Sequence, residues 1–395
     1  MKIKPKLPEW GTSIFTIMSR MAVEHNAINL AQGFPDFNCD EELLELVHHF
    51  QIKGFNQYAP MQGVQALRKA ISEKIEKLYG THYDFENEIT VTAGATQALF
   101  TAITSVVESG DEVILFEPAY DSYVPDILSN GGIPVYIPLN PNDYSYDWDL
   151  VRKKISNRTR AIILNSPHNP TGSLITGDDI KELEKITKGT NILILSDEVY
   201  EHITFDGKKH LSLAGSEELA KRTFVISSFG KTYHTTGWKM GYCAAPESLT
   251  KEFRKMHQFI VFSVNTPIQY AYSEFMKQED RYLSLGKFYE HKRDVFVNAI
   301  KSALGGSQPA SPAGGFKIKN CDGTYFQLLD YSSVSDKPDM EFAEYLTKEI
   351  GVAVIPLSPF YKSTESQSLV RICFAKSDEV LKEAAAKLQK LQARI

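Results

Sequence analysis

The sequence predicts an α/β protein with a large domain, in which helices cover a mostly parallel seven-stranded sheet, and a smaller α+β domain. First, seven short apolar segments alternate with segments of helical period between residues 88 and 246. Second, several of these segments are apolar on both faces, which is typical of strands buried inside a parallel sheet. Third, 395 residues exceed what one hydrophobic core usually spans.

The expected sheet accounts for the middle of the chain. Its strands are expected at residues 88–94, 111–118, 133–139, 159–167, 191–198, 223–230 and 240–246. Helical periodicity at 95–110 and 176–189 indicates the crossover helices that parallel strands require. Because ligands of such sheets bind at the carboxyl ends of the strands, functional residues are expected there.

The rest of the chain forms the expected small domain. Helices are expected at residues 246–262, 267–280 and 281–304, and an α+β module follows with strands at 323–330, 351–358 and 369–375 and an amphipathic helix at 377–395. The first 45 residues lack the strand–helix alternation and are expected to pack with this module. We therefore expect a discontinuous small domain of residues 1–46 and 283–395, and a large cofactor-binding domain of residues 47–282.

The composition argues against several classes of protein. The net charge of −6 is spread along the chain, whereas nucleic acid is bound through clustered Lys and Arg. The beginning of the sequence lacks the apolar segment of a signal peptide, and no run of about 18 apolar residues predicts a membrane span. The four cysteines lack metal-ligand spacing. We expect a cytoplasmic protein with no metal site and no nucleic-acid or membrane partner.

Polar side chains follow two of the most apolar strands. Asn169 precedes a proline in "NSPHNPTG", which is first of all a turn signal, but at a strand end it also offers a rigid amide. Asp197 could be an ordinary helix N-cap. After the apolar strand "ILILS", however, its carboxylate lies deep and requires a cationic partner. Tyr200 follows three residues later and points to the same neighbourhood.

Two other strand ends have weaker signals. "TAGATQALF" resembles a strand that turns into a helix start at Ala95 and Thr96, which is ordinary punctuation when taken alone. The free amides and the positive end of such a helix could also hold a phosphate. In "FEPAYDSY", Tyr120 follows a strand end; aromatic residues are more often core, but this ring could stack on a ligand.

Three cationic residues stand in apolar surroundings. Lys231 and Lys239 lie in "SSFGKTYHTTGWKMGY", between two expected strands, where a surface lysine gains nothing. Arg371 lies inside the apolar strand "LVRICFA", and a buried guanidinium is rare without a partner. It could form a structural ion pair, or its planar fork could grip a substrate carboxylate.

Together these residues match the requirements of pyridoxal 5'-phosphate. Its aldehyde forms a Schiff base with a lysine, and its pyridinium nitrogen needs a carboxylate to stay protonated. Lys231 is then the lysine that binds the cofactor. Lys239 and Ser228 would hold the phosphate together with the helix start at Ala95 and Thr96.

The chain resembles the fold-type I pyridoxal-phosphate aminotransferases of class I/II over nearly its whole length. Six motifs occur in the family's order: "NLAQGFPDF", "NQYAPMQG", "NSPHNPTG", "SDEVYEHI", "SSFGKTYHTTGWKMGY" and "VRICFA". The spacings between Asn169, Asp197 and Lys231 agree as well. An ordered set of six is far more specific than one motif. Within the family, the chain is most similar to bacterial methionine aminotransferases and to kynurenine/glutamine aminotransferases.

The resemblance implies roles around the cofactor ring. Lys231 carries the Schiff base and, once displaced, moves the proton. Asp197 pairs with the pyridinium nitrogen, and Asn169 and Tyr200 hydrogen-bond the ring hydroxyl oxygen. Tyr120 stacks on the ring.

It also implies how substrate is bound and shared between subunits. Arg371 grips the α-carboxylate with help from Asn169 and the backbone near Gly33. Tyr58, in "NQYAP", matches a tyrosine that reaches the phosphate of the partner subunit. The resemblance therefore implies a homodimer with shared active sites.

Departures from the family bear on specificity. Lys239 stands where many members have arginine, which keeps the charge but loses the fork. Thr96 stands where kynurenine aminotransferases carry an aromatic residue, and Phe15 or Ile14 takes the place of their pocket tryptophan. The pocket is expected to be apolar without strong aromatic sandwiching, which favours methionine and related apolar or aromatic amino acids.

The expected reaction is a ping-pong transamination through pyridoxamine phosphate with a 2-oxo acid as acceptor. The alternative is a kynurenine/glutamine aminotransferase with cysteine-conjugate β-lyase side activity, which the motifs do not exclude. The ligand-sensing domain of a transcription regulator is disfavoured, because "NLAQGFPDF" begins at residue 29 and leaves no room for a DNA-binding domain before it.

Overall fold

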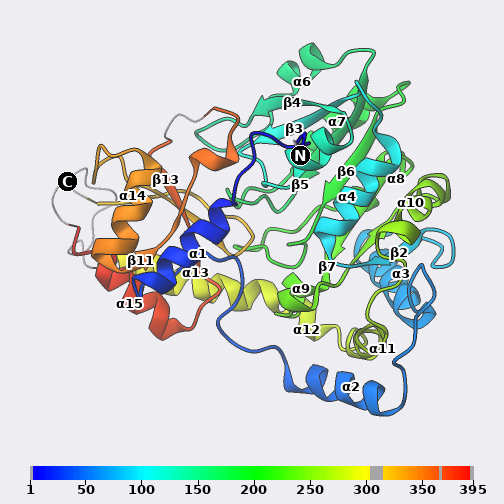
Figure 1. Ribbon diagram of the computed structural model, residues 1–395, viewed down its shortest axis with the longest axis horizontal. Coiled ribbons are helices and arrows are strands. Elements are labelled where there is room, and N and C mark those ends of the chain that lie inside the picture. Colours follow the sequence, from blue (N-terminus) through cyan, green and yellow to red (C-terminus); the bar gives the residue numbers. More distant parts are fainter. Residues whose placement is uncertain (1–2, 303–314, 364–366, 392–395) are drawn as a thin grey trace.

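The computed structural model describes residues 3–302, 315–363 and 367–391 (Figure 1). The expected seven-stranded sheet is present, in the order β2-β8-β7-β6-β5-β3-β4. Its strands are β2 (Ile89–Thr92), β3 (Glu112–Glu117), β4 (Ile133–Pro138), β5 (Thr159–Asn165), β6 (Leu193–Asp197), β7 (Thr223–Ser228) and β8 (Gly241–Ala244). Only β8 runs antiparallel to its neighbours, so the prediction of a mostly parallel sheet is confirmed.

Successive residues of the central strands face two different cores. In β5, Ile162 and Leu164 pack in the core on one face of the sheet, whereas Ala161 and Ile163 pack in the core on the other. The helices α4 (Ala95–Val106), α5 (Tyr123–Ser129) and α10 (Glu247–Ile260) cover the second face, and α6 (Trp148–Lys154) and α7 (Gly177–Thr187) cover the first. Burial on both faces explains the continuous apolar runs in these strands.

The register of the parallel strands brings their carboxyl ends together. Asn165 at the end of β5 pairs with Asp197 at the end of β6, and β6 pairs in turn with β7. Ser228 at the end of β7 lies opposite Gly241, the first residue of β8. The polar residues that follow these strands therefore share one edge of the sheet.

A further group of helices packs around the β2 end of the sheet. The sequence predicted no helix between residues 47 and 87, where α3 (Gln65–Tyr79) and half of α2 (Glu41–Ile52) lie. The group consists of α2 (Glu41–Ile52), α3 (Gln65–Tyr79) and α11 (Thr266–Phe275). Three short helices complete this part of the chain: α8 (Glu217–Ala220), α9 (Phe229–Thr232) and α12 (Asp280–Leu283).

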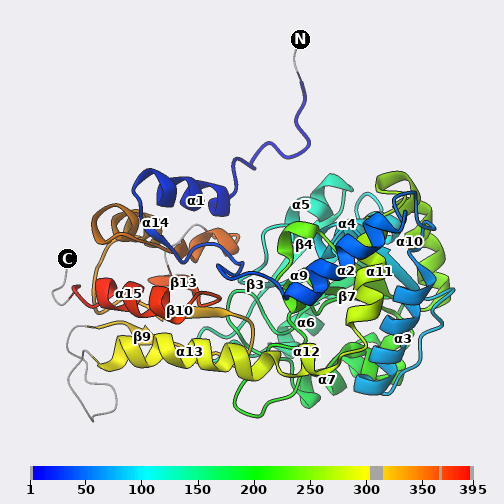
Figure 2. The same ribbon diagram turned by 90° about the horizontal axis from the view of Figure 1, so that it is seen from below.

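The N-terminal and C-terminal parts pack together beside the large sheet (Figures 1 and 2). Strand β1 (Ile28–Asn29) pairs in parallel with β11 (Val352–Ala353), so the N-terminal segment does meet the C-terminal module. An antiparallel sheet in the order β12-β13-β10-β9 lies between α1 on one side and α13 and α15 on the other. The domain boundaries at residues 46/47 and 282/283 stay predictions.

The elements of this smaller part are α1 (Ile14–Glu24), α13 (Leu285–Ser302), β9 (Lys317–Ile318), β10 (Phe326–Asp330), α14 (Asp339–Tyr345), β12 (Ile355–Pro356), β13 (Leu369–Cys373) and α15 (Asp378–Leu388). Helix α14 continues into a π-helical turn, Leu346–Ile350. The expected helix ends at residues 303–304 and 392–395 lie outside the described residues.

Candidate active site

A cavity of about 280 Å³ opens at the carboxyl ends of the large sheet's strands, next to the small sheet. Every site residue predicted from the sequence, with one exception, lines it: Phe15, Gly33, Ala95, Thr96, Tyr120, Asn169, Asp197, Tyr200, Ser228, Lys231, Lys239 and Arg371. The exception is Tyr58, whose side chain is 84% exposed and touches the ring of Phe262. One sheet edge therefore collects residues that are up to 356 positions apart in the chain.

Lys231 reaches into the cavity from α9, the short helix that follows β7 directly. Its Nζ donates hydrogen bonds to the carbonyl oxygen of Gly33 (3.1 Å) and to the hydroxyl of Tyr325 (2.8 Å). Burial lowers the pKa of the Lys231 amine to about 8. A substantial fraction of the amine is therefore neutral near physiological pH, as a nucleophile and proton carrier requires.

Asp197 ends β6 and is buried at the cavity. The Tyr123 hydroxyl donates to its Oδ2 at 2.6 Å, and the amide of Val199 donates to Oδ1 at 3.3 Å. Burial raises the pKa of the Asp197 carboxyl to about 6. Within the described residues, no Lys or Arg forms an ion pair with it. A carboxylate held in this way suits a cationic ligand in the cavity.

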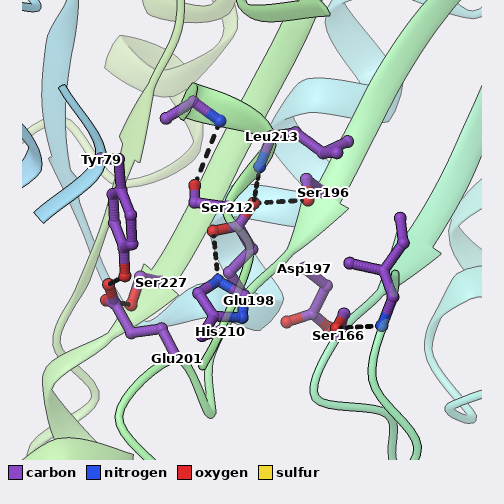
Figure 3. Close-up of polar contacts among 12 residues, drawn as sticks. Tyr79, Ser166, Ser196, Asp197, Glu198, Glu201, His210, Ser212, Leu213 and Ser227 are labelled. Atoms are coloured by element: carbon purple, nitrogen blue, oxygen red, sulfur yellow. Dashed lines mark hydrogen bonds and ion pairs between the residues drawn. The ribbon is translucent and has the colours of Figure 1, made fainter. Parts of the chain in front are cut away.

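The neighbouring acids Glu198 and Glu201 have their partners within the protein (Figure 3). Glu198 accepts bonds from the Ser196 hydroxyl and the Leu213 amide and lies 2.8 Å from His210 Nε2. Glu201 is surrounded by an ammonium group and three hydroxyl groups, which belong to Lys74, Tyr79, Ser227 and Tyr242. These two carboxylates are saturated, and Asp197 alone of the three faces the cavity.

Arg371 lies in the middle of β13 and is 1% exposed. Its Nη1 donates to Asn169 Oδ1 (2.9 Å) and its Nη2 to the carbonyl oxygen of Ala31 (3.1 Å), while its Nε has no partner among the described residues. The guanidinium carbon lies 3.8 Å from the centroid of the Phe326 ring. Burial lowers the pKa of Arg371, and the opposing effects of Tyr200, Cys373, Tyr325 and Asp121 do not outweigh it. The site fits a carboxylate ligand.

The start of α4 forms a cradle with the loop that carries the two lysines. Gly94 caps the helix with φ 81°, and no side chain caps its first turn, which leaves amide groups for a ligand. A Cβ at Gly241 would lie 2.7 Å from the Ser227 carbonyl oxygen and 3.0 Å from the Ala95 nitrogen. Only glycine therefore allows the start of β8 to lie this close to the backbone of β7 and of α4. Lys239 and Ser228 complete the cradle.

Aromatic side chains form the remaining walls. Burial raises the pKa of the Tyr120 hydroxyl to about 12, so this ring stays neutral. Tyr200 packs edge-on against Tyr325, with 5.1 Å between ring centroids. Phe15 comes from α1 and packs edge-on against Phe360, 5.1 Å from the guanidinium of Arg371.

Three aromatic residues contact the predicted site residues but were missed. Tyr123 bonds Asp197, Tyr325 bonds Lys231, and Phe326 underlies Arg371. Tyr123 stands in the same motif as Tyr120, and the pair Tyr325-Phe326 lies within the strand expected at residues 323–330. In the sequence these aromatic residues look like core residues, and no signal in the residues around them shows which catalytic side chain each one contacts.

The residues fit pyridoxal 5'-phosphate on structural grounds. Among the described residues, the amine of Lys231 is buried, the carboxylate of Asp197 has no ion-pair partner, and the Nε of Arg371 has no hydrogen-bond partner. The uncapped start of α4 faces the same cavity. A phosphate, an aldehyde and a protonated ring nitrogen would each meet a complementary group.

The comparison with known families decides the class. A sequence profile described as "Aminotransferase class I and II" matches residues 25–388. The chain belongs to this family. The predicted aminotransferase class, fold and pyridoxal 5'-phosphate dependence are thereby confirmed for this class I and II aminotransferase.

Individual relatives match over almost their full lengths. The methionine aminotransferase of Escherichia coli (strain K12) is 48% identical over 387 residues, which cover 98% of this chain and 97% of that protein. A solved E. coli structure reported with a methionine aminotransferase function has a TM-score of 0.94 at 48% identity, covering 99% of this chain and 100% of that one. The kynurenine–oxoglutarate transaminase of Dictyostelium discoideum is 34% identical and covers 97% and 95%.

Two features are absent from residues 3–302, 315–363 and 367–391. No helix there is both long and apolar enough to cross a membrane. In the same residues, no cluster of three or more His, Cys, Asp or Glu side chains could hold a metal ion.

Proposed function

We propose that this aminotransferase takes the amino group of an apolar L-amino acid, methionine foremost, and gives it to a 2-oxo acid. The observation that carries the proposal is the 48% identity to the E. coli methionine aminotransferase across the whole chain. The cavity supports it, because Phe15, Leu99, Val199, Met240 and Phe326 give it apolar lining. Such a lining favours a methionine side chain over a charged one.

The site can bind an amino-acid substrate through its α-carboxylate and its amino group. Arg371 and Asn169 take the α-carboxylate, with the unpartnered Nε and the backbone near Gly33 close by. The amino group is thereby directed towards Lys231, which lines the same cavity. A carboxylate fixed by a buried fork aligns the reacting carbon at little entropic cost.

The cofactor and the side chains of the cavity have different roles in the reaction. Pyridoxal phosphate, when bound, supplies the aldehyde that takes up the amino group and the ring that accepts an electron pair. Lys231 binds the cofactor and carries the proton, and Asp197 stabilises positive charge on the ring nitrogen. Tyr200 and Asn169 would form hydrogen bonds with the hydroxyl oxygen of the cofactor ring. Ser228, Lys239 and the start of α4 hold the phosphate.

The test uses the absorbance of the bound cofactor, recorded before and after adding single amino acids without any oxo acid. Methionine is expected to convert the absorbance band most completely, and Lys231→Ala is expected to retain the cofactor but to lose turnover by at least 10³-fold. The conservative variant Lys239→Arg serves as control and should keep Lys231 functional. Transaminase activity of Lys231→Ala near the wild-type rate would refute the assignment.

A kynurenine or glutamine donor with a cysteine-conjugate β-lyase side activity is the second candidate. The 34% identity to the Dictyostelium kynurenine–oxoglutarate transaminase favours it. Elimination releases pyruvate and ammonia and needs no acceptor oxo acid. Pyruvate formed from a cysteine conjugate alone, at a rate above methionine transamination, would favour this candidate.

We also propose a homodimer with shared sites. Tyr58 lies outside the cavity of its own chain and is 84% exposed, beside the exposed Phe262. The loop at Tyr58 is tied to the end of α10, because Ser263 Oγ donates to the Ala59 carbonyl oxygen. This arrangement supports a role for Tyr58 in the site of a second copy. A cytoplasmic location stays a prediction.

A further inference from the structure

The Lys231 amine belongs to a triangle of hydrogen bonds that the reaction scheme above does not use. Its Nζ donates to the Tyr325 hydroxyl (2.8 Å) and to the Gly33 carbonyl oxygen (3.1 Å). The Tyr325 hydroxyl itself donates to the same carbonyl oxygen at 2.6 Å. The Lys231 amine, the Tyr325 hydroxyl and the Gly33 carbonyl oxygen, which are far apart in the chain, are thus all hydrogen-bonded to one another.

The number of protons in the triangle fixes the direction of each bond. A tyrosine hydroxyl has one proton, and Tyr325 gives it to Gly33, so its oxygen can only accept from Lys231. The carbonyl oxygen of Gly33 has two lone pairs and accepts both bonds. A neutral amine has two N–H groups and one lone pair. Both N–H groups are therefore occupied, and the third position on nitrogen stays free on the cavity side.

We propose that Tyr325 is a positioning residue for catalysis: together with the Gly33 carbonyl oxygen it holds the free Lys231 amine so that its lone pair faces the substrate. This inference rests on the proposed role of Lys231. In the ammonium form the same position holds the proton that is passed on. The hydroxyl of Tyr325 thus fixes the point from which Lys231 accepts and returns the substrate's proton.

The surroundings keep both acceptors in place. Tyr325 is fully buried, and its ring packs against those of Tyr200, Tyr289 and Phe326 at 5.1, 5.5 and 4.9 Å. A Cβ at Gly33 would lie 2.9 Å from Phe326 Cζ, so the backbone there is pressed against the ring. Neither acceptor can follow a displaced lysine, which is what positioning requires.

Other groups also act on the Lys231 amine and must be separated from Tyr325. Burial has the largest effect, followed by charged or titratable side chains from several elements: Cys373 and Arg371 on β13, Lys239 after β7, and Asp197 on β6. None of these changes when only the Tyr325 hydroxyl is removed.

The first experiment measures the pKa of the Lys231 amine in the full chain after cofactor removal. An amine-reactive reagent is applied across a pH series, and modification at Lys231 is followed by peptide mass spectrometry. Tyr325→Phe keeps the ring and removes one acceptor that favours the ammonium, so the pKa of Lys231 is expected to fall by about one pH unit. An unchanged pKa would overturn the inference.

Tyr289→Phe is the matched control. Its ring adjoins that of Tyr325, and its buried hydroxyl has no hydrogen-bond partner among the described residues. It removes the same atom from the same aromatic cluster, and the pKa of Lys231 is expected to stay unchanged. Equal shifts in the two variants would mean a general packing effect and would refute the role of Tyr325. If Tyr325→Phe does not fold, 3-fluorotyrosine at position 325 keeps the hydroxyl, weakens its oxygen as an acceptor, and should produce a smaller fall.

The second experiment uses the holoenzyme. In Tyr325→Phe, kcat is expected to fall about tenfold with KM within twofold, and exchange of the methionine C2 proton with solvent should slow equally. A rise in KM alone would indicate a substrate contact and contradict the inference. If Lys231→Ala retains activity, the proposed function fails. If Lys231→Ala is inactive and Tyr325→Phe behaves like wild type, only this inference fails.

Discussion

Asp197 carries a charge that burial disfavours in the absence of a cationic ligand. The pKa of its carboxyl is raised to about 6 in the folded chain, above the ordinary value of 3.8. Between these values the folded protein binds more protons than the unfolded one. The free energy of unfolding therefore decreases as the pH rises from about 4 to 6, and this loss persists at higher pH.

Asp197→Asn is expected to stabilise the cofactor-free protein while abolishing activity. The amide keeps the shape, and its oxygen can accept from Tyr123, but it cannot become charged. At pH 8 the free energy of unfolding should exceed that of wild type by up to roughly 3 kcal/mol, because each pH unit of pKa shift corresponds to about 1.4 kcal/mol. Urea unfolding at pH 3 provides the internal control, because the gain should vanish below both pKa values. A gain of equal size at both pH values would contradict the explanation.

Helix α3 is joined to the sheet by an ion pair that is buried on both sides. Lys74 Nζ lies 2.6 Å from Glu201 Oε1, with side-chain exposures of 6% and 3%. Burial acts to raise the pKa of the Glu201 carboxyl, but Lys74 and the other partners outweigh it and hold the pKa below its usual range. Glu201 directly follows Tyr200 in the chain, and it accepts a hydrogen bond from Ser227, which directly precedes Ser228. The ion pair therefore holds the chain next to two residues of the cavity.

Lys74→Met is expected to lower the free energy of unfolding by about 3–5 kcal/mol, because it leaves the Glu201 charge buried without a cation. Adding Glu201→Gln should recover part of the loss, since no charge then remains. The control is Lys77→Met on the same helix, whose exposed pair with Glu279 should contribute less than about 1 kcal/mol. Denaturant unfolding measures all three. A double variant no more stable than Lys74→Met would argue against an unpaired charge as the cause.

The elements that could be predicted are those with local signals. Each strand of the large sheet is a short apolar run that ends in Gly, Pro, Ser or Asp or is followed by one of them within two residues, and all seven strands were predicted. The run 351–358 was expected as one strand, but β11 pairs with β1 and β12 with β13. The expected helix 281–304 divides into α12 and α13 around Ser284. An apolar run predicts burial, but it does not say which neighbour a strand will pair with.

The assembled site is predictable where strand ends and family motifs coincide. Asp197 and Lys231 follow strands, so the sheet edge that gathers them was visible in the sequence. The hydroxyl of Tyr325 meets Lys231 across 94 positions, and Lys74 meets Glu201 across 127. Such partners depend on how elements that are far apart in the chain pack against each other. No periodicity or spacing along the chain records that geometry.

The proposed homodimer depends on an exposed aromatic patch, formed by Tyr58 and Phe262, with Phe259 three residues before Phe262 in the chain. Phe259 at the end of α10 is 86% exposed, and Tyr58 and Phe262 lie beside each other with 5.5 Å between their ring centroids. Aromatic residues so exposed in water are typical of contact surfaces. A second copy of this chain that covers the patch would bring Tyr58 towards the phosphate cradle of its partner.

Phe259→Glu is therefore expected to halve the molar mass measured by light scattering, because a charge at the centre of an apolar contact is left without a partner. Cofactor affinity should fall about tenfold with it, since Tyr58 of the second copy would no longer reach the phosphate. Val23→Glu is the control: Val23 is 81% exposed on α1, outside the patch, and both properties should stay unchanged. If Phe259→Glu kept the wild-type mass but lost cofactor affinity, Tyr58 would have to act within its own chain. A wild-type mass corresponding to one chain would exclude the shared site, and Arg371, Asp197 and Lys231 would then form a site complete within one chain.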